Sequence, residues 1–165
     1  KQSYPTLVET LGSPIILKSN YGSRGDGVYL IHNQKELDHT LGQINGDYIL
    51  QEFVASSYGK DIRVHVIGGK IVASVLRSSD HDFRSNFSQG GRAEQIELTP
   101  EMIAISLAAA EAMNLQIAGI DLLISDHGVL LCEINGIPGF RTVWLTSKTN
   151  IPQEIFHFLT SIKKE

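Results

Sequence analysis

The sequence contains a single cysteine, Cys132, among its 165 residues. An internal disulfide and a zinc site built from several cysteines are therefore excluded, and a reducing compartment is favoured. No apolar run approaches the roughly 20 residues that a bilayer-spanning helix needs. The N-terminal residues 1–5 do not resemble a signal peptide either. We therefore expect a cytoplasmic globular protein that does not associate with a membrane.

The chain also lacks an excess of positive charge, since its formal net charge is −4. A broad basic field, which would attract nucleic acid or an anionic membrane surface, is not expected. The sequence shows no internal repeat and no low-complexity segment. Nor does it show an arrangement of Ser, His and Asp, or of Cys and His, that would suggest a protein nucleophile. Nucleic acid is therefore not an expected partner.

The length suffices for one domain or for two small lobes. We expect two α+β lobes with largely antiparallel sheets, 1–55 and 56–165, because residues 55–60 are small and polar. In the first lobe, apolar runs and turn residues predict three strands and two helices, the second capped by Asn33. These are a helix at 5–12, strands at 14–18, 28–31 and 47–54, and a helix at 33–41.

The second lobe begins with a predicted hairpin, 61–67 and 70–77, around a Gly68-Gly69 turn compatible with type I′. A long, irregular polar loop is expected over residues 78–92, and loops of this length usually have a function. A helix should then run from Pro100, with Thr99 as its cap, to about Met113. Residues 151–163 have the pattern of an amphipathic closing helix.

A second predicted hairpin, 119–124 and 129–135, carries acidic residues on two apolar strands. A three-residue loop, 126–128, with Gly128 in the left-handed conformation places Asp121 opposite Glu133, and the two-residue period puts Asn135 on the face of Glu133. Opposed carboxylates repel unless a positive charge lies near them, and an all-oxygen set suits Mg²⁺. The alternative is a polar face in water, against which the apolar character of both strands argues.

A glycine-rich loop follows the strand that ends in Lys18. Its backbone N–H groups could approach phosphate oxygens, with the Lys18 ammonium as a point charge. The loop matches neither the Walker A pattern nor Gly-x-Gly-x-x-Gly before a helix. It would suit a flexible flap over a triphosphate, and the alternative is a glycine-rich turn beside a surface lysine. The residues concerned are Gly22, Ser23, Gly25 and Gly27.

Other charged residues are more ambiguous. Asp61 and Arg63 share one face of a predicted strand, which is equally compatible with a functional pair and with a weak surface pair. The run 80–82, Asp-His-Asp, lies in a loop without a fixed scaffold, so we favour no metal there. The long loop is bracketed by guanidinium groups suited to carboxylate or phosphate, namely Arg77, Arg84 and Arg92. Cys132 should face the core and be unreactive.

Taken together, the motifs of nearly the whole chain resemble those of the ATP-grasp ligases, and within them the RimK-type carboxylate–amine ligases. The motifs occur in the family's order. They are Ile-Leu-Lys at 16–18, the glycine loop 22–27, Leu-Gln-Glu-Phe-Val at 50–54, Gly-Lys-Asp-Ile-Arg at 59–63, Asp-Phe-Arg-Ser-Asn at 82–86 before Gly90-Gly91, Gly-Ile-Asp at 119–121, and Glu-Ile-Asn-x-x-Pro-Gly at 133–139.

The resemblance implies an ATP-grasp fold, in which two lobes clasp a nucleotide, and it implies roles for individual residues. Lys18 and the glycine loop would contact phosphates, and Asp61 would lie near the ribose. The backbone of the segment between the lobes would recognise the adenine edge through Gln51, Glu52, Phe53 and Val54. Arg84 would hold a phosphate or an acyl phosphate, so Lys18 and Arg84 are the candidate catalytic residues. Mg²⁺, or Mn²⁺ in its place, would bind Asp121, Glu133 and Asn135.

The implied chemistry is activation of a carboxylate by ATP, giving an acyl phosphate that an amine attacks. The amine would belong to an amino acid such as glutamate, and the carboxylate to a protein C-terminus or a small molecule. A homo-oligomer is also a family expectation. Full-length members have a preceding N-terminal domain that nothing here matches. We therefore expect a fragment that is inactive by itself, and a nucleotide-binding module without turnover is the alternative.

Overall fold

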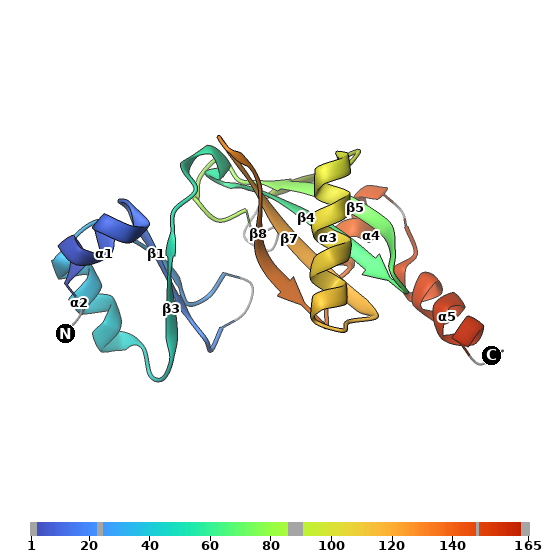
Figure 1. The fold of residues 1–165 in the computed structure, drawn as a ribbon, viewed down its shortest axis with the longest axis horizontal. Helices are drawn as coiled ribbons and strands as arrows, with labels where there is room; N and C mark the ends of the chain where they lie inside the picture. The colour runs from blue at the N-terminus through green and yellow to red at the C-terminus, as the bar shows by residue number, and fades with distance from the viewer. Residues whose placement is uncertain (1–2, 23–24, 86–90, 148, 163–165) are drawn as a thin grey trace. The chain divides into compact units, whose positions relative to one another are not determined.

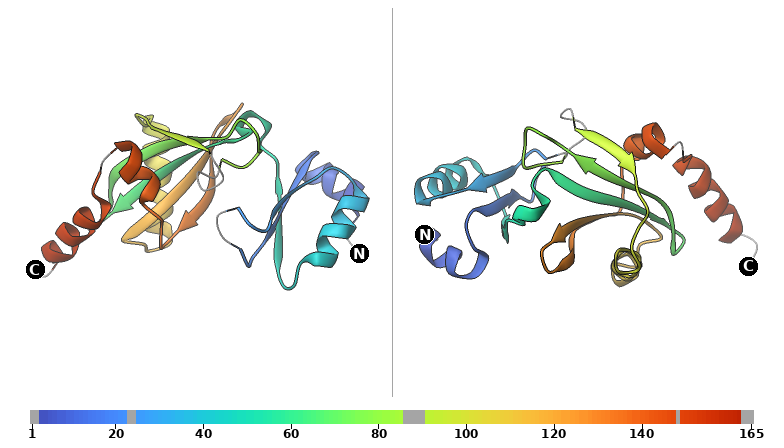
Figure 2. Two further views of the ribbon diagram at one scale, coloured as in Figure 1. Left: turned by 180° about the vertical axis from the view of Figure 1, so that it is seen from behind. Right: turned by 90° about the horizontal axis from the view of Figure 1, so that it is seen from above.

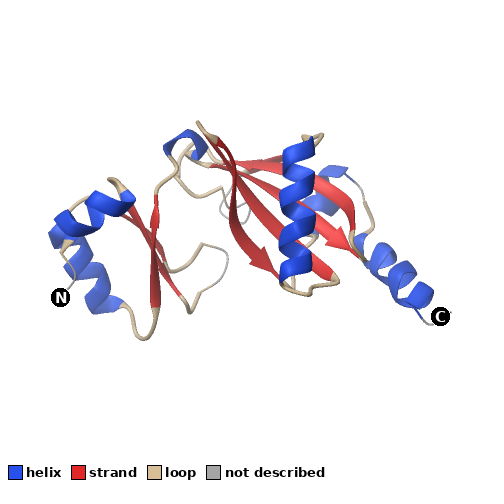
Figure 3. Cartoon of the chain, viewed as in Figure 1, coloured by secondary structure: helices blue, strands red, loops and turns tan. Residues whose placement is uncertain are grey.

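The computed structural model describes residues 3–22, 25–85, 91–147 and 149–162. Ser23, Arg24, Asn86 and Gly90, which belong to expected motifs, lie outside the described residues. The chain divides into two compact units, Lys1–Ala55 and Ser56–Glu165. Each unit combines helices with an antiparallel sheet, so the predicted α+β class is confirmed (Figures 1 and 3). No helix in the described part of the chain is long and apolar enough to cross a membrane.

The first unit is a three-stranded sheet with helices on one face. Strand β1 (Ile15–Ser19) lies between β2 (Val28–Ile31) and β3 (Tyr48–Glu52). Helices α1 (Tyr4–Leu11) and α2 (Gln34–Gln43) pack beside each other against it (Figure 1). Ile15 and Leu17 are fully buried in the core with residues of both helices. Since strand side chains alternate, Ile16 and Lys18 face away from the helices.

The second unit is a five-stranded sheet in the order β6-β5-β4-β7-β8, antiparallel throughout. Its hairpins are β4 (Lys60–Ile67) with β5 (Lys70–Ser78), and β7 (Ile117–Ser125) with β8 (Gly128–Asn135). The short helix η1 (Ala55–Ser57) precedes β4. Ser57 Oγ donates to the carbonyl of Ile124 at 2.9 Å and accepts from its N–H at 2.8 Å, which ties η1 to the end of β7.

Helices cover both faces of this sheet (Figure 2). Helix α3 (Pro100–Ala112) buries Met102, Ala109 and Ala110 against the even-numbered side chains of β4, including Ile62 and Val64. On the opposite face, α4 (Arg141–Ser147) and α5 (Ile151–Ile162) contribute Val143 and Ile151 to a second cluster with Ile67, Ala73 and Val75. The odd-numbered positions of β4 face the same side as this second cluster. Asp61 and Arg63 occupy two of these positions and are not part of the cluster.

Several local predictions are confirmed. Asn33 and Thr99 cap α2 and α3, each accepting a hydrogen bond from the backbone N–H three residues on. Both Gly68 and Gly69 have positive φ, as a type I′ turn requires. Three elements were not predicted. The short helix η1 lies at the expected lobe boundary, strand β6 (Arg92–Gln95) begins at the last residue of the expected irregular loop and extends the sheet, and α4 follows the second hairpin.

The second hairpin has the predicted register at residues 119–121, including the pair of Asp121 and Glu133, but neither the predicted loop nor the predicted pairing of residues 122–125. Ser125 pairs with Gly128, so the loop contains two residues rather than three. Because Leu122 pairs with Leu131 and Asp121 with Glu133, Cys132 is an extra residue that forms a bulge and restores the register. Strand β8 is an edge strand, and its Leu130 and Leu131 are 41% and 45% exposed. The argument that both arms are too apolar to meet solvent therefore fails for β8.

Candidate active site

In the first unit, two of the expected nucleotide-binding residues have side chains on the sheet face that the helices leave uncovered. Lys18 pairs with Ile49, and Ile16 with Gln51, so Lys18 and Gln51 share this face. Lys18 is half-buried. Its position on a central strand places the ammonium at a defined point of the sheet rather than on a loose surface loop.

The backbone segments at the two ends of the glycine loop lie side by side. Ser19 donates its N–H to the carbonyl of Gly27 at 2.8 Å. A Cβ atom at Gly22 would lie 2.3 Å from the carbonyl oxygen of Asp26, so glycine is required there for the chain to fold back. Gly25 and Gly27 have positive φ, at 87° and 79°. These described ends of the loop form a tight turn, and Ser23 lies outside the described residues.

The remaining nucleotide-binding candidates of the first unit lie at and after the end of β3. Gln51 and Glu52 are its last two residues, and Phe53 and Val54 follow before η1. Phe53 and Val54 are half-buried, whereas Glu52 is exposed. Asp61, the candidate expected near a ribose, belongs to β4 of the second unit.

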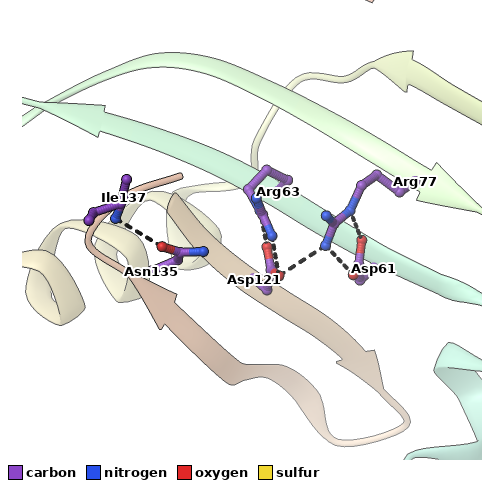
Figure 4. A network of polar contacts seen from close by, with 6 residues as sticks. All are labelled: Asp61, Arg63, Arg77, Asp121, Asn135 and Ile137. Carbon is purple, nitrogen blue, oxygen red and sulfur yellow. Dashed lines mark hydrogen bonds and ion pairs between the residues drawn. The ribbon is translucent and has the colours of Figure 1, made fainter. Parts of the chain in front are cut away.

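A buried network of four charged residues lies on the second unit's sheet (Figure 4). Arg77 Nε donates to Asp61 Oδ1 at 2.6 Å, and a second bond joins its Nη2 to Asp61 Oδ2. Arg63 Nη2 donates to Asp121 Oδ2 at 2.6 Å, and its Nε bonds Asp121 Oδ1. Arg77 Nη2 also reaches Asp121 Oδ2 at 2.9 Å. The two arginines thus neutralise the two aspartates.

Strand register explains this network. Asp61 lies directly opposite Arg77 on β5, and Arg63 lies directly opposite Asp121 on β7. Burial by itself would raise the pKa of Asp121, but the hydrogen bonds from Arg63 and the positive charges of both arginines outweigh it and lower that pKa. Burial would likewise lower the pKa of Arg77, but the charges of Asp121 and Asp61 raise it. Asp121 is therefore ionised at neutral pH.

His65 lies beside this network and was not singled out from the sequence. It is 2% exposed, and neither ring nitrogen has a hydrogen-bond partner among the described residues. Burial and the nearby charge of Arg63 lower its pKa to about 4. The imidazole is therefore neutral at ordinary pH. An isolated histidine within a strand carries no sequence signal for such burial.

The three candidate metal ligands lie near one end of the β7–β8 hairpin. Asp121 is 6% exposed and opposes Glu133, which is exposed, while Asn135 pairs with Gly119 two residues further along. Asn135 Oδ1 accepts the Ile137 N–H at 2.9 Å, which orients the amide (Figure 4). Two carboxylates and an amide oxygen fit Mg²⁺ in donor type. Within the described residues, no cluster of three or more His, Cys, Asp or Glu residues could hold a metal.

Arg84 follows a loop that is closely tied to the start of β4. Gly59 donates its N–H to the carbonyl of Phe83 at 3.0 Å, and a Cβ at Gly59 would lie 2.4 Å from the carbonyl oxygen of Ser79. Arg84 Nη2 bonds Asp82 Oδ2 at 2.7 Å, and this hydrogen bonding lowers the pKa of Asp82. Asp82 therefore pairs with an arginine rather than belonging to a metal cluster.

Comparison with known structures shows that this architecture is shared with ATP-grasp ligases. The structure of ATP-grasp ligase PsnB with a phosphomimetic variant of its minimal precursor, Mg and ADP matches with a TM-score of 0.71 at 18% identity, covering 95% of this chain and 48% of that one. D-alanine–D-alanine ligase from Bacillus anthracis complexed with ATP matches with a TM-score of 0.72 at 21% identity, covering 100% of this chain and 57% of that one. The fold is thus the ATP-grasp fold.

The sequence identifies the family within this class. The family model described as RimK-like ATP-grasp domain matches residues 2–159, so the chain belongs to the RimK-like ATP-grasp family. A probable alpha-L-glutamate ligase from Histophilus somni (strain 2336) is 40% identical over 157 residues, 92% of this chain and 52% of the relative. Another, from Picosynechococcus sp. (strain ATCC 27264 / PCC 7002 / PR-6), is 36% identical over 163 residues, 96% of this chain and 54% of the relative. The chain thus spans about half the length of these curated relatives.

Proposed function

We propose that this chain is the ATP-binding catalytic portion of an ATP-dependent carboxylate–amine ligase that acts in the cytoplasm. The observation that carries the proposal is the family match over residues 2–159. Its relatives named as probable alpha-L-glutamate ligases suggest that the amine belongs to glutamate or a similar amino acid. A protein C-terminus or a small molecule would supply the carboxylate.

The reaction consists of two displacements. A carboxylate oxygen attacks the γ-phosphorus of ATP, the bond from that phosphorus to the β–γ bridging oxygen breaks, and ADP leaves. The amine nitrogen then attacks the acyl carbon, a proton leaves the nitrogen, and inorganic phosphate departs as the amide bond forms. Neither step needs a protein nucleophile, so the protein contributes mainly positioning and charge neutralisation.

The roles proposed for individual residues are those that the resemblance of their motifs to the family implies. Lys18 and the glycine loop would bind phosphates, with Gly22, Gly25 and Gly27 in the described ends of the loop and Ser23 outside them. Residues 51–54 would bind the adenine edge, and Arg84 would hold the transferred phosphate. Asp61 would lie near the ribose, although its carboxylate pairs with Arg77 in this structure.

Asp121, Glu133 and Asn135 are the proposed ligands of Mg²⁺, for which Mn²⁺ could substitute. When bound, the ion would neutralise charge on the phosphates. Glu133 is exposed and Asn135 is oriented by the Ile137 N–H, so both can present oxygen atoms to an ion. The carboxylate of Asp121 is already bound by two arginines.

Replacement of Lys18 by alanine tests the proposed phosphate contact. A hydrogen bond to a charged group contributes roughly 1.5–3 kcal/mol, so Lys18→Ala should weaken binding of a non-hydrolysable ATP analogue about tenfold or more. Calorimetry with the analogue and Mg²⁺ measures this affinity. Lys35→Ala is the matched control, because it removes the same charge from an exposed position on α2. Equal affinities for both variants would contradict the placement of Lys18.

A nucleotide-binding module without turnover is the second candidate. The two candidates differ in whether ADP is released when an amino acid and a carboxylate acceptor are added to the chain with ATP. Amine-dependent ADP release would support the ligase. Binding of the analogue without such release would support the module, and no binding at millimolar analogue would exclude both.

A further inference from the structure

The aspartate proposed to bind Mg²⁺ is already held by cationic side chains. Both oxygens of Asp121 accept hydrogen bonds from Arg63, and Oδ2 also accepts one from Arg77. The side chains of Arg63 and Asp121 are only 13% and 9% exposed. The two arginines together use three of the roughly four lone-pair sites of this carboxylate, which leaves a metal ion little access to it. Arg63 and a divalent cation therefore compete for the oxygen atoms of Asp121.

The two arginines differ in how firmly they are held. Arg77 makes two bonds to Asp61 besides its bond to Asp121, so it stays paired if Asp121 is withdrawn. The guanidinium bonds of Arg63 in the described structure both go to Asp121. The Arg63 stem passes over β7, with Cδ 3.4 Å from where a Cβ at Gly119 would lie. Arg63 is therefore the partner that a metal ion would displace.

We propose that Arg63 is a positioning residue that competes with the divalent cation for Asp121. The proposal rests on the proposed metal site at Asp121, Glu133 and Asn135. Without the ion, Arg63 neutralises the buried carboxylate and fixes its orientation. An ion bound at Oδ2, or at both oxygens, must displace an arginine N–H group, and an ion at the remaining site of Oδ1 lies beside the positive charge of Arg63. In either case the affinity of the chain for the ion alone is lowered.

Binding of Mn²⁺ to the nucleotide-free chain tests this competition, with free Mn²⁺ measured by electron paramagnetic resonance. Arg63→Gln removes the competing charge, so this variant should bind Mn²⁺ about tenfold or more tightly than the parent chain. Arg63→Lys keeps the positive charge but cannot form the bidentate pair of hydrogen bonds, so its affinity for Mn²⁺ should lie between those of the parent chain and Arg63→Gln. If the glutamine variant does not fold, the affinity of Arg63→Lys alone tests whether Arg63 competes with the ion for Asp121. Arg92→Gln, which removes an arginine paired with exposed Asp80, should bind like the parent.

Glu133→Gln, made in the parent and in the Arg63→Gln background, separates this proposal from the metal site itself. If it weakens Mn²⁺ binding in both backgrounds while Arg63→Gln gives no gain, the site stands and the competition is overturned. If it changes affinity in neither background, the metal site fails, and the competition fails with it. Absence of Mn²⁺ binding at millimolar concentration in the parent and in the folded Arg63 variants would also overturn the competition.

Discussion

The two hairpins of the second unit place charges opposite each other in contrasting ways. In β4–β5, opposite charges meet, because Asp61 pairs with Arg77. In β7–β8, like charges meet, because Asp121 pairs with Glu133. The strand order explains why the like-charged pair is tolerated, since β4 lies between β5 and β7. The arginines of the first hairpin reach Asp121 of the second, while Glu133 on the edge strand remains exposed.

The contrast shows that like charges can face each other when one is neutralised from its other side. Asp121 is compensated by neighbouring strands and can be buried, whereas solvent screens the charge of Glu133. Removing a charge should therefore have opposite effects on stability in the two cases. Loss of Asp121 leaves buried arginines under-compensated, and loss of the Glu133 charge relieves a repulsion.

The largest effect is expected for Asp121→Asn. Breaking a buried ion pair by removing one partner costs roughly 3–5 kcal/mol, so the free energy of unfolding should fall by about that amount. Urea denaturation followed by circular dichroism measures it. Asp80→Asn is the matched control, since its pair with Arg92 is exposed and such pairs contribute about 0–1 kcal/mol. If the free energy of unfolding fell by similar amounts in Asp121→Asn and Asp80→Asn, the buried ion pairs would contribute no more to stability than the exposed one.

The next effect concerns His65, whose pKa is lowered from 6.5 to about 4. Between these pH values the unfolded chain binds a proton that the folded chain does not, so the free energy of unfolding decreases as the pH falls. One pKa unit corresponds to 1.36 kcal/mol, so this decrease amounts to about 3 kcal/mol. It begins near pH 6.5 and is complete near pH 4.

Denaturation at a series of pH values should show this contribution in the parent chain and its loss in His65→Leu. His157→Gln, at an exposed position of α5, should retain the parent's pH dependence. If His65→Leu kept the same slope between pH 6.5 and 4, another group would be responsible for it.

The smallest effect, and one of opposite sign, is expected for Glu133→Gln. Opposed like charges destabilise a strand pair, and cross-strand pairs contribute about 0.2–1 kcal/mol. In buffer without divalent ions the free energy of unfolding should therefore rise by up to this amount, as measured by urea denaturation. A clear decrease would show that the Glu133 charge makes a favourable contact instead.

Local chemistry made much of the fold predictable. The caps at Asn33 and Thr99, the Gly68-Gly69 turn and the alternating strands depend on residues close together in the sequence. The ordered motifs also identified the ATP-grasp fold and the RimK-like family. The polar edge strand β6 was missed, because the four residues Arg-Ala-Glu-Gln carry little strand signal. Helix α4 was missed because its seven residues, Arg-Thr-Val-Trp-Leu-Thr-Ser, include β-branched and aromatic residues of low helix propensity.

The candidate site depended on details that spacing alone does not give. Counting from the Gly68-Gly69 turn places Asp61 opposite Leu76, but Val72 is an extra residue in β5, which shifts the pairing to Arg77. A bulge at Cys132 similarly compensates for the shorter second loop. These one-residue insertions decide which charges meet, and nothing in the local composition marks them.

The sequence by itself therefore determined most of the elements and the family. It also predicted the opposition of Asp121 to Glu133, but through a three-residue loop in place of the two-residue loop and bulge that the structure has. Only the tertiary structure decided that Arg63 and Arg77 neutralise Asp121 and that His65 is buried beside them. The physical reason is the range of the interactions. Caps and turns are formed by neighbours in the chain, whereas the partners of Asp121 lie 58 and 44 residues away and meet it only when β4 is placed between β5 and β7.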